Sequence, residues 1–211
     1  LDGKITNINS SQKWITSNFA RSHVQQIRSL YDAVLVGTNT MLFDNPRLNT
    51  RIEGYNILNA RIILDSTLKI NLECKLIKSI KKNPLIIFTG PKYNLKKYKK
   101  LESLGVKLFK IDLDSNKQLS IDGVLKSINK TNIKSILVEG GAKVASTFLN
   151  KQLLDIIFIY RSDCFIGGES LSMFDKIDFN QDFELFNEVS LGSNKLEVWI
   201  NKNLKQIRGL F

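Results

Sequence analysis

Residues 135–149, SILVEGGAKVASTFL, combine an apolar run, a pair of glycines and a helical pattern. Apolar residues at 136–138 predict a short buried strand, and Val144, Ala145, Phe148 and Leu149 follow helical spacing. A turn from a strand into a helix aims free backbone N–H groups and the positive end of the helix dipole at one place. Gly140 and Gly141 leave space for a ligand beside that backbone. The stretch therefore predicts either a phosphate cradle or a turn that uses glycine for its geometry alone.

The same alternation of strand and helix recurs along the chain. Helices are expected at 16–30, 95–104 and 121–128, with a short helical turn at 38–44, and strands at 1–8, 33–36, 61–65, 84–89, 106–111 and 156–160. This order favours an α/β fold with a mostly parallel central sheet flanked by helices. Alternating runs at 183–191 and 196–201 predict a closing antiparallel β-hairpin at one edge of that sheet. Without an internal repeat or a Pro/Gly linker, residues 1–211 are expected to form one domain.

Composition excludes several classes of protein. No apolar run approaches the ~20 residues that cross a bilayer, so no membrane partner is expected. Cys74 and Cys164 stand far apart without a CxxC motif, which argues against a zinc site or a disulfide framework and favours a reducing, cytoplasmic location. His23 is the only histidine, so a His-rich metal site is excluded. The chain opens at Leu1 without Met, which suggests a fragment whose N-terminus is truncated.

The formal net charge of +11 is concentrated between residues 61 and 110, where 13 Lys or Arg face three acidic residues. Such a block suits a polyanion such as RNA. The aromatic residues within it do not form an RNA-recognition pattern, and its lysines at 96, 97, 99 and 100 fit a solvated helix face. We expect no nucleic-acid partner, and we keep a non-catalytic basic nucleotide- or RNA-binding domain as an alternative.

Polar residues gather where the expected parallel strands end, which is where such sheets bind ligands. These residues are Thr40 and Asp44 after the strand at 33–36, Ser66 after the strand at 61–65, and Glu139 with the two glycines after the strand at 136–138. Arg28, Arg47 and Arg51 could reach the same crevice, and Arg binds phosphate in a bidentate fork. Each residue also has a simpler role, since Thr40 can cap a helix, Asp44 can serve the Asn45-Pro46 turn and Arg28 can be solvated.

Several catalytic signatures are absent from the sequence. It contains no G-x-G-x-x-G, Walker GK[ST], G-x-S-x-G or Cys/His nucleophile pattern. A cofactor that carries its own reactivity is therefore favoured. From the residues alone, the chain is a nucleotide- or phosphosugar-binding α/β enzyme whose reaction is not specified.

A set of ordered blocks resembles the reductase domain of the bacterial bifunctional riboflavin-biosynthesis deaminase-reductases. The blocks are Leu1-Asp2-Gly3-Lys4, Lys13-Trp14-Ile15-Thr16, Ala20-Arg21, Arg28, Asp32-Ala33, Val36-Gly37-Thr38-Asn39-Thr40, Asp44-Asn45-Pro46-x-Leu48-x-Thr50-Arg51, Leu64-Asp65-Ser66 and Val138-Glu139-Gly140-Gly141-Ala142. The resemblance extends from residue 1 to about 160, and the hairpin fits the end of that domain. It implies a dihydrofolate-reductase-like fold and NADPH-dependent reduction of 5-amino-6-(5-phosphoribosylamino)uracil to its ribitylamino product.

The resemblance also implies a role for individual residues. Cofactor contacts fall on Trp14, Thr40, Asp44, Ser66, Gly140, Gly141, Ala142 and Ala145. Substrate contacts fall on Gln12, Arg28, Leu48, Arg51 and Glu139, where Gln12 replaces the family's usual Ser and has Ser11 beside it. Lys4 and Glu139 are the expected catalytic residues, easing ring opening or supplying a proton, and no metal is expected.

The resemblance leaves a second reductase reaction open. In that alternative, the diaminopyrimidinone ribosylamino phosphate is reduced before deamination, by the same fold and cofactor. The deaminase signature H-x-E…P-C-x-x-C is absent, so this chain should not deaminate, and a deaminase domain would precede Leu1 in a bifunctional protein. Members of the family are commonly dimers, so a homodimer is expected.

Overall fold

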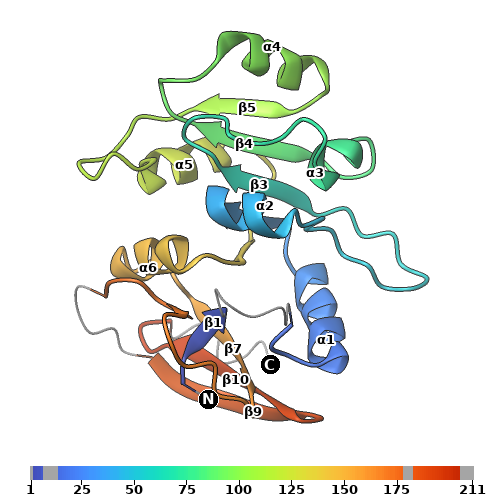
Figure 1. The fold of residues 1–211 in the computed structure, drawn as a ribbon, viewed down its shortest axis with the longest axis vertical. Coiled ribbons are helices and arrows are strands. Elements are labelled where there is room, and N and C mark those ends of the chain that lie inside the picture. Colours follow the sequence, from blue (N-terminus) through green and yellow to red (C-terminus); the bar gives the residue numbers. More distant parts are fainter. Residues whose placement is uncertain (1, 7–13, 178–182, 205–211) are drawn as a thin grey trace. The chain divides into compact units, whose positions relative to one another are not determined.

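A computed structural model of the protein describes residues 2–6, 14–177 and 183–204 (Figure 1). The chain forms two compact units. One is Gln25–Val144, called here the parallel-sheet unit. The other combines Leu1–Val24 with Ala145–Phe211 and is called the hairpin unit. Each unit is described by itself.

The parallel-sheet unit contains a five-stranded, fully parallel sheet. In spatial order its strands are β5 (Lys107–Lys110), β4 (Leu85–Thr89), β3 (Ala60–Leu64), β2 (Ala33–Gly37) and β6 (Ile136–Val138). The strands β2 and β4 are buried along their whole length, as continuous apolar runs predict for a sheet covered on both faces. The expected parallel sheet is therefore confirmed, and it brings the ends of β2, β3 and β6 to one edge.

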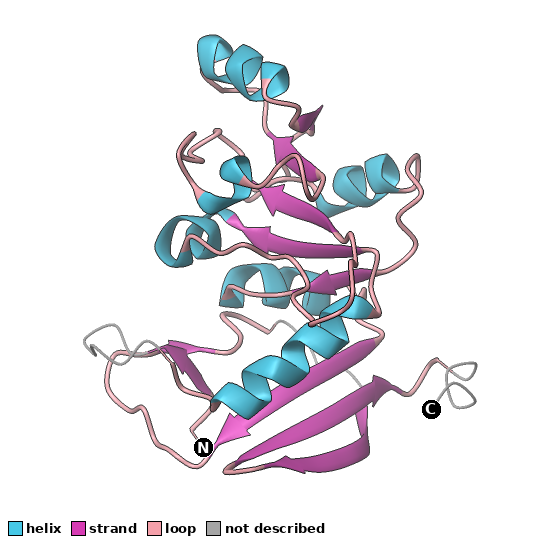
Figure 2. Ribbon diagram, turned by 90° about the vertical axis from the view of Figure 1, so that its right-hand side faces the viewer, coloured by secondary structure: helices cyan, strands magenta, loops and turns pink. Residues whose placement is uncertain are grey.

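Helices lie on both sides of this sheet (Figure 2). They are α2 (Thr38–Asp44), α3 (Lys75–Lys78), α4 (Leu95–Ser103) and α5 (Ile121–Ile128). Two further helices, α1 (Asn18–Ser29) and α6 (Ala142–Asn150), each begin in one unit and end in the other. The core packs Val36, Ile63 and Ile87 of the central strands against Leu76 of α3 and Leu101 of α4.

The hairpin unit holds the C-terminal strands in a sheet of their own. Its order is β7 (Ile156–Ser162), β10 (Asn194–Asn201) and β9 (Phe183–Leu191), all antiparallel. A second pair joins β1 (Lys4–Thr6) to β8 (Leu171–Ser172). The expected hairpin is confirmed, but its expected place at an edge of the parallel sheet is wrong.

The physical reason lies in the pattern of β10. Leu196 and Val198 alternate with more polar residues and pack with Phe158 and Tyr160 of β7 and with Ala20 of α1. Such alternation is typical of an antiparallel sheet with a single core face. The apolar run of β7 resembles a central parallel strand in sequence, yet it pairs with β10 along its whole length.

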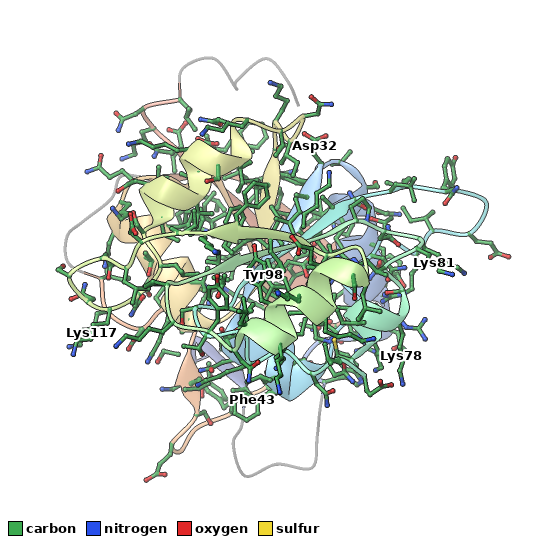
Figure 3. The ribbon with its side chains drawn as sticks, turned by 90° about the horizontal axis from the view of Figure 1, so that it is seen from above. Asp32, Phe43, Lys78, Lys81, Tyr98 and Lys117 are labelled. Atoms are coloured by element: carbon green, nitrogen blue, oxygen red, sulfur yellow. The ribbon has the colours of Figure 1, made fainter. Side chains whose placement is uncertain are left out.

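The basic block is mostly a solvated surface, as expected. On α4, Lys96, Lys99 and Lys100 are exposed. Figure 3 labels Lys78 and Lys81 of the block, together with Tyr98 of α4. Arg61 is the exception, because it is fully buried in β3 and donates to Ser79 Oγ at 2.6 Å and to the Asn83 carbonyl at 2.5 Å. Burial lowers the pKa of Arg61 to about 10. Among the described residues, no helix has the length and apolar character needed to span a membrane.

Ser120 begins α5 as the sequence predicts, because its hydroxyl accepts the Gly123 N–H at 3.3 Å. We expect Ser120→Ala to lower the free energy of unfolding by about 1 kcal/mol, the usual cost of a lost N-cap. The matched control is Ser127→Ala in the same helix, where the hydroxyl only donates back to the Gly123 carbonyl. That variant should be neutral or slightly more stable in urea unfolding. Equal losses in both variants would contradict the capping role.

Asp32 joins the beginning of β2 to the segment before β6. Its Oδ2 accepts from the backbone N–H groups of Lys134 at 2.7 Å and Ser135 at 2.9 Å. These hydrogen bonds, with the Lys134 N–H first, lower the pKa of Asp32 from its ordinary 3.8.

Because the folded pKa lies below the unfolded value, the stability that ionised Asp32 contributes is present above pH 3.8 and is lost as the pH falls through the lowered pKa. At pH 6 we expect the urea concentration at the unfolding midpoint to be higher for wild type than for Asp32→Asn. Below pH 3.8 the difference between the two midpoints should become smaller. A gap independent of pH would contradict this linkage.

Candidate functional site

The glycine turn follows β6 at the edge where β2 ends. Glu139 N–H donates to the Leu35 carbonyl at 2.8 Å, which holds the turn against β2. Gly140 and Gly141 then adopt φ of 110° and 80°, a left-handed conformation that favours glycine. A Cβ on Gly141 would lie 3.2 Å from Thr40 Oγ1. The turn therefore lies against the first turn of α2, and α6 begins directly after it at Ala142.

The glycine turn and the start of α6 have the features of a site for a nucleotide phosphate. Two side-chain-free residues precede a helix of nine residues with no acidic residue in its first turn. Free N–H groups and a positive helix end attract an anion, and a Cβ on Gly141 would crowd Thr40 Oγ1 at 3.2 Å. The residues present thus fit a phosphate group.

Beside this turn, Glu139 forms a two-pronged ion pair with Arg28 of α1. Arg28 Nε donates to Oε1 at 2.6 Å, and Nη2 donates to Oε2 at 2.5 Å. The two side chains are only 12% and 20% exposed, so the pair is partly shielded from water. The remaining terminal nitrogen of Arg28 donates to the Asn49 carbonyl at 3.3 Å. Both members of the pair were predicted as site residues from the sequence, and the structure brings them together.

Arg51 joins the same cluster through Asn49. Its Nη1 donates to Asn49 Oδ1 at 3.0 Å. The pKa of Arg51 is lowered first by burial and then by the positive charges of Arg28 and Arg47, while Glu139 opposes that effect. Two further guanidinium groups and one carboxylate therefore lie close enough to Arg51 to affect its charge. Such an excess of positive charge, carried by forked donors, suits a phosphate or another anionic oxygen ligand.

The end of β3 supplies a more structural group of contacts. Thr38 Oγ1 donates to the Leu64 carbonyl at 2.8 Å, and buried Asp65 accepts the Ile70 N–H at 2.8 Å. The Ser66 carbonyl accepts the Gly90 N–H at 2.9 Å. These bonds fix the loops at the ends of β2, β3 and β4. The partly exposed Ser66 is held beside this edge.

The predicted site residues are divided between the two units. The parallel-sheet unit contains Arg28, Thr40, Asp44, Leu48, Arg51, Ser66, Glu139, Gly140, Gly141 and Ala142. The hairpin unit contains Lys4, Trp14 and Ala145, while Gln12 lies outside the described residues. Within the hairpin unit, Lys4 Nζ donates to Ser172 Oγ at 3.2 Å and Trp14 is 54% exposed with the Arg21 guanidinium 4.5 Å from its ring.

The structure also shows the surroundings of two predicted contact residues, Leu48 and Asp44. Leu48 is 2% exposed and belongs to the core cluster, with a left-handed φ of 54°. Its side chain therefore packs in the core. Asp44 is exposed at the end of α2, where Asn45 adopts a left-handed φ of 42° and accepts the Lys75 N–H at 3.0 Å.

Sequence reasoning missed three amides that hold the arginines. Gln25 Oε1 accepts the Arg51 N–H at 3.1 Å, and Asn49 contacts both arginines. Asn59, the residue directly before β3, is buried and donates to the Arg28 carbonyl at the end of α1. Asn49 lies inside the Leu48-x-Thr50-Arg51 block, so that block could have indicated it as a site residue. No local pattern indicates Gln25 or Asn59.

A parallel sheet with a glycine turn and an arginine–carboxylate cluster at one edge is typical of α/β proteins that bind their ligand at the carboxyl ends of the strands. Sequence comparison makes the assignment specific. The chain belongs to the RibD C-terminal domain family, whose model matches residues 1–202.

Curated relatives agree with this family. The RibD riboflavin biosynthesis protein of Actinobacillus pleuropneumoniae is 33% identical over 80% of this chain and 44% of its own length. The 5-amino-6-(5-phosphoribosylamino)uracil reductase of Buchnera aphidicola is 29% identical over 77% of this chain and 80% of its own. The 2,5-diamino-6-ribosylamino-4(3H)-pyrimidinone 5′-phosphate reductase of Aquifex aeolicus is also 29% identical, over 81% of this chain and 76% of its own. The chain spans less than half the length of the RibD protein.

A solved structure supports the fold. The Thermotoga maritima diaminohydroxyphosphoribosylaminopyrimidine deaminase/5-amino-6-(5-phosphoribosylamino)uracil reductase aligns with a TM-score of 0.72 and 28% identity over 95% of this chain and 54% of its own. The expected dihydrofolate-reductase-like α/β class is thereby confirmed.

Proposed function

We propose that this chain is an NADPH-dependent oxidoreductase of riboflavin biosynthesis that converts 5-amino-6-(5-phosphoribosylamino)uracil to its 5-phosphoribitylamino product. The observation that carries this proposal is the Arg28–Glu139 pair, which adjoins both Arg51 and the glycine turn. A forked cation beside a carboxylate suits a substrate with an anionic end and a sugar that must exchange a proton. Family membership and the Buchnera aphidicola reductase support the reaction.

In this proposal the glycine turn holds the cofactor. Gly140, Gly141 and Ala142 present backbone N–H groups to its phosphates, and Thr40 lies against the same turn. Asp44, Ser66, Trp14 and Ala145 remain proposed cofactor contacts. When bound, NADPH supplies the hydride that reduces C1′ of the opened sugar.

The arginine cluster holds the substrate in this proposal. Arg28 and Arg51 fix the 5-phosphate or the uracil carbonyls, which orients the sugar for reduction. Glu139 and Lys4 ease ring opening or provide a proton, while Leu48 and Gln12 remain proposed substrate contacts. No residue of this mechanism requires a metal. Among the described residues, no group of three His, Cys, Asp or Glu side chains could hold one.

A single assay tests the proposal against its alternatives. Purified chain is mixed with NADPH or NADH and each of the two candidate pyrimidines, and loss of reduced-nicotinamide absorbance is followed. We expect consumption of NADPH with the uracil substrate. Preference for the diaminopyrimidinone would shift the assignment to reduction before deamination. No consumption with either, together with salt-sensitive RNA binding, would favour the basic binding domain.

Further proposals concern the organisation of the protein. Both units together form one reductase domain, since the family model spans them. In the full protein an N-terminal deaminase domain precedes it, because the RibD relative is more than twice as long as the matched region. We propose a homodimer, which light scattering would test, and a cytoplasmic location, which the two widely spaced cysteines without a CxxC motif favour.

A further inference from the structure

Asn59, which directly precedes β3, is 1% exposed and uses both ends of its side-chain amide. Its Nδ2 donates to the carbonyls of Arg28, at 2.8 Å, and Tyr31. Its Oδ1 accepts from Thr50 Oγ1 at 2.5 Å. A buried amide with three hydrogen bonds is held in one orientation, because loss of any partner would leave a polar atom unsatisfied.

The partners of Asn59 belong to the two segments that carry the arginines. Arg28 and Tyr31 stand at the end of α1, where the last carbonyls of the helix have no partner within it. Thr50 directly precedes Arg51. Asn59 therefore connects the backbone that carries one guanidinium to the backbone that carries the other.

Two other contacts join the same segments, but they differ in kind. Gln25 Oε1 accepts the Arg51 N–H, and Arg28 Nη1 donates to the Asn49 carbonyl. The first is exposed to water. The second uses the guanidinium that a ligand would engage. The third connection runs through the Asn59 side chain, which is buried. It uses the Arg28 backbone carbonyl and the Thr50 hydroxyl, so both guanidinium groups are left for a ligand.

We propose that Asn59 is a positioning residue that, through Thr50, sets the separation of Arg28 and Arg51. This inference rests on the proposed function, because the two arginines are there the groups that bind the phosphorylated pyrimidine. Bidentate recognition depends on geometry, so a loosened Thr50 loop weakens substrate binding more than it weakens the fold.

Asn59 also caps α1, so its replacement could lower stability without any effect on the position of Arg51. The loop connection therefore has to be removed separately from the cap. Thr50→Val removes only the connection to the loop and leaves the two bonds to the helix carbonyls. Thr50→Ser retains the hydroxyl and serves as the matched rescue variant. Asn59→Leu removes all three bonds and measures the cap and the connection together.

The experiment measures KM for the pyrimidine, KM for NADPH, kcat and urea unfolding for each variant. We expect Thr50→Val to raise KM for the pyrimidine about tenfold, the scale of one buried hydrogen bond, with KM for NADPH changed less than about twofold. Thr50→Ser should stay near wild type. A Thr50→Val protein with unchanged pyrimidine KM, or with equal rises in both KM values, would overturn the inference.

The inference can be separated from the proposed function. If wild type consumes NADPH with neither pyrimidine, the proposed function fails, and binding of ribose 5-phosphate is then measured by calorimetry. A weaker affinity in Thr50→Val than in wild type and Thr50→Ser would still support the positioning role. Equal affinities in all three proteins, or no binding to wild type, would overturn it.

Discussion

Glu139→Gln should lower kcat by a factor of about 10² to 10⁴, the contribution that a positioned proton-transfer group makes. Gln keeps the length and the carbonyl oxygen of Glu139 but can neither accept nor deliver the proton. It also removes the charge that receives Arg28 Nε and Nη2 at 2.6 and 2.5 Å. Both losses are specific to this side chain, so steady-state kinetics on the purified variant give a direct test.

The two losses affect different constants. Loss of proton transfer lowers kcat, whereas release of Arg28 changes KM for the pyrimidine because the guanidinium is no longer oriented. The control is Glu102→Gln, the same change on the exposed residue of α4 in the same unit. Normal turnover by the Glu139→Gln enzyme would remove Glu139 from proton transfer, and a change confined to KM would leave it only the role of orienting Arg28.

Gly141→Ala should weaken NADPH binding by about 10- to 100-fold, measured by quenching of tryptophan fluorescence. An added Cβ would lie 3.2 Å from Thr40 Oγ1, so the turn or Thr40 would have to shift and the backbone N–H groups of the proposed phosphate cradle would move with the turn. The residue also has a φ of 80°, so any side chain there adds backbone strain of about 1–3 kcal/mol.

Strain and cradle can be separated with a second glycine. Gly105 has a φ of 91°, and a Cβ built on it meets no atom within 4 Å. Gly105→Ala should therefore lose similar stability in urea and keep its affinity for NADPH. If both variants lost affinity equally, the effect of Gly141 would be one of strain on the fold, and the turn would not be the phosphate site.

Helices with a capping residue and a regular apolar pattern could be predicted from the sequence, and helices without these features could not. Helix α5 has a Ser cap and a strong apolar stripe, and its predicted bounds match the structure. By contrast, α3 has four residues and no side-chain cap, which is too little pattern to recognise. The position of the hairpin was mistaken because alternation reveals that a strand has one covered face but does not reveal which strand it pairs with.

In the candidate site, too, some residues could be predicted from the sequence and others could not. Arg28 and Glu139 are 111 positions apart, and they entered one prediction through the family resemblance and through the rule that ligands bind at the carboxyl ends of parallel strands. Asn59 contacts residues 28 and 31 positions away, and no residue type or spacing marks that relation. Sequence therefore indicated the groups that meet a ligand better than the groups that hold them.

The pairing of β2 with β6 has a consequence for synthesis of the chain. The buried strand β2 ends at Gly37. The strand β6 (Ile136–Val138), which pairs with one side of β2, leaves the ribosome about a hundred residues later. Until then the nascent protein exposes an apolar strand with unpaired hydrogen-bonding groups, a template for aggregation. Chains stopped before residue 136 should therefore associate with chaperones or precipitate, while those extended through β6 become competent to fold.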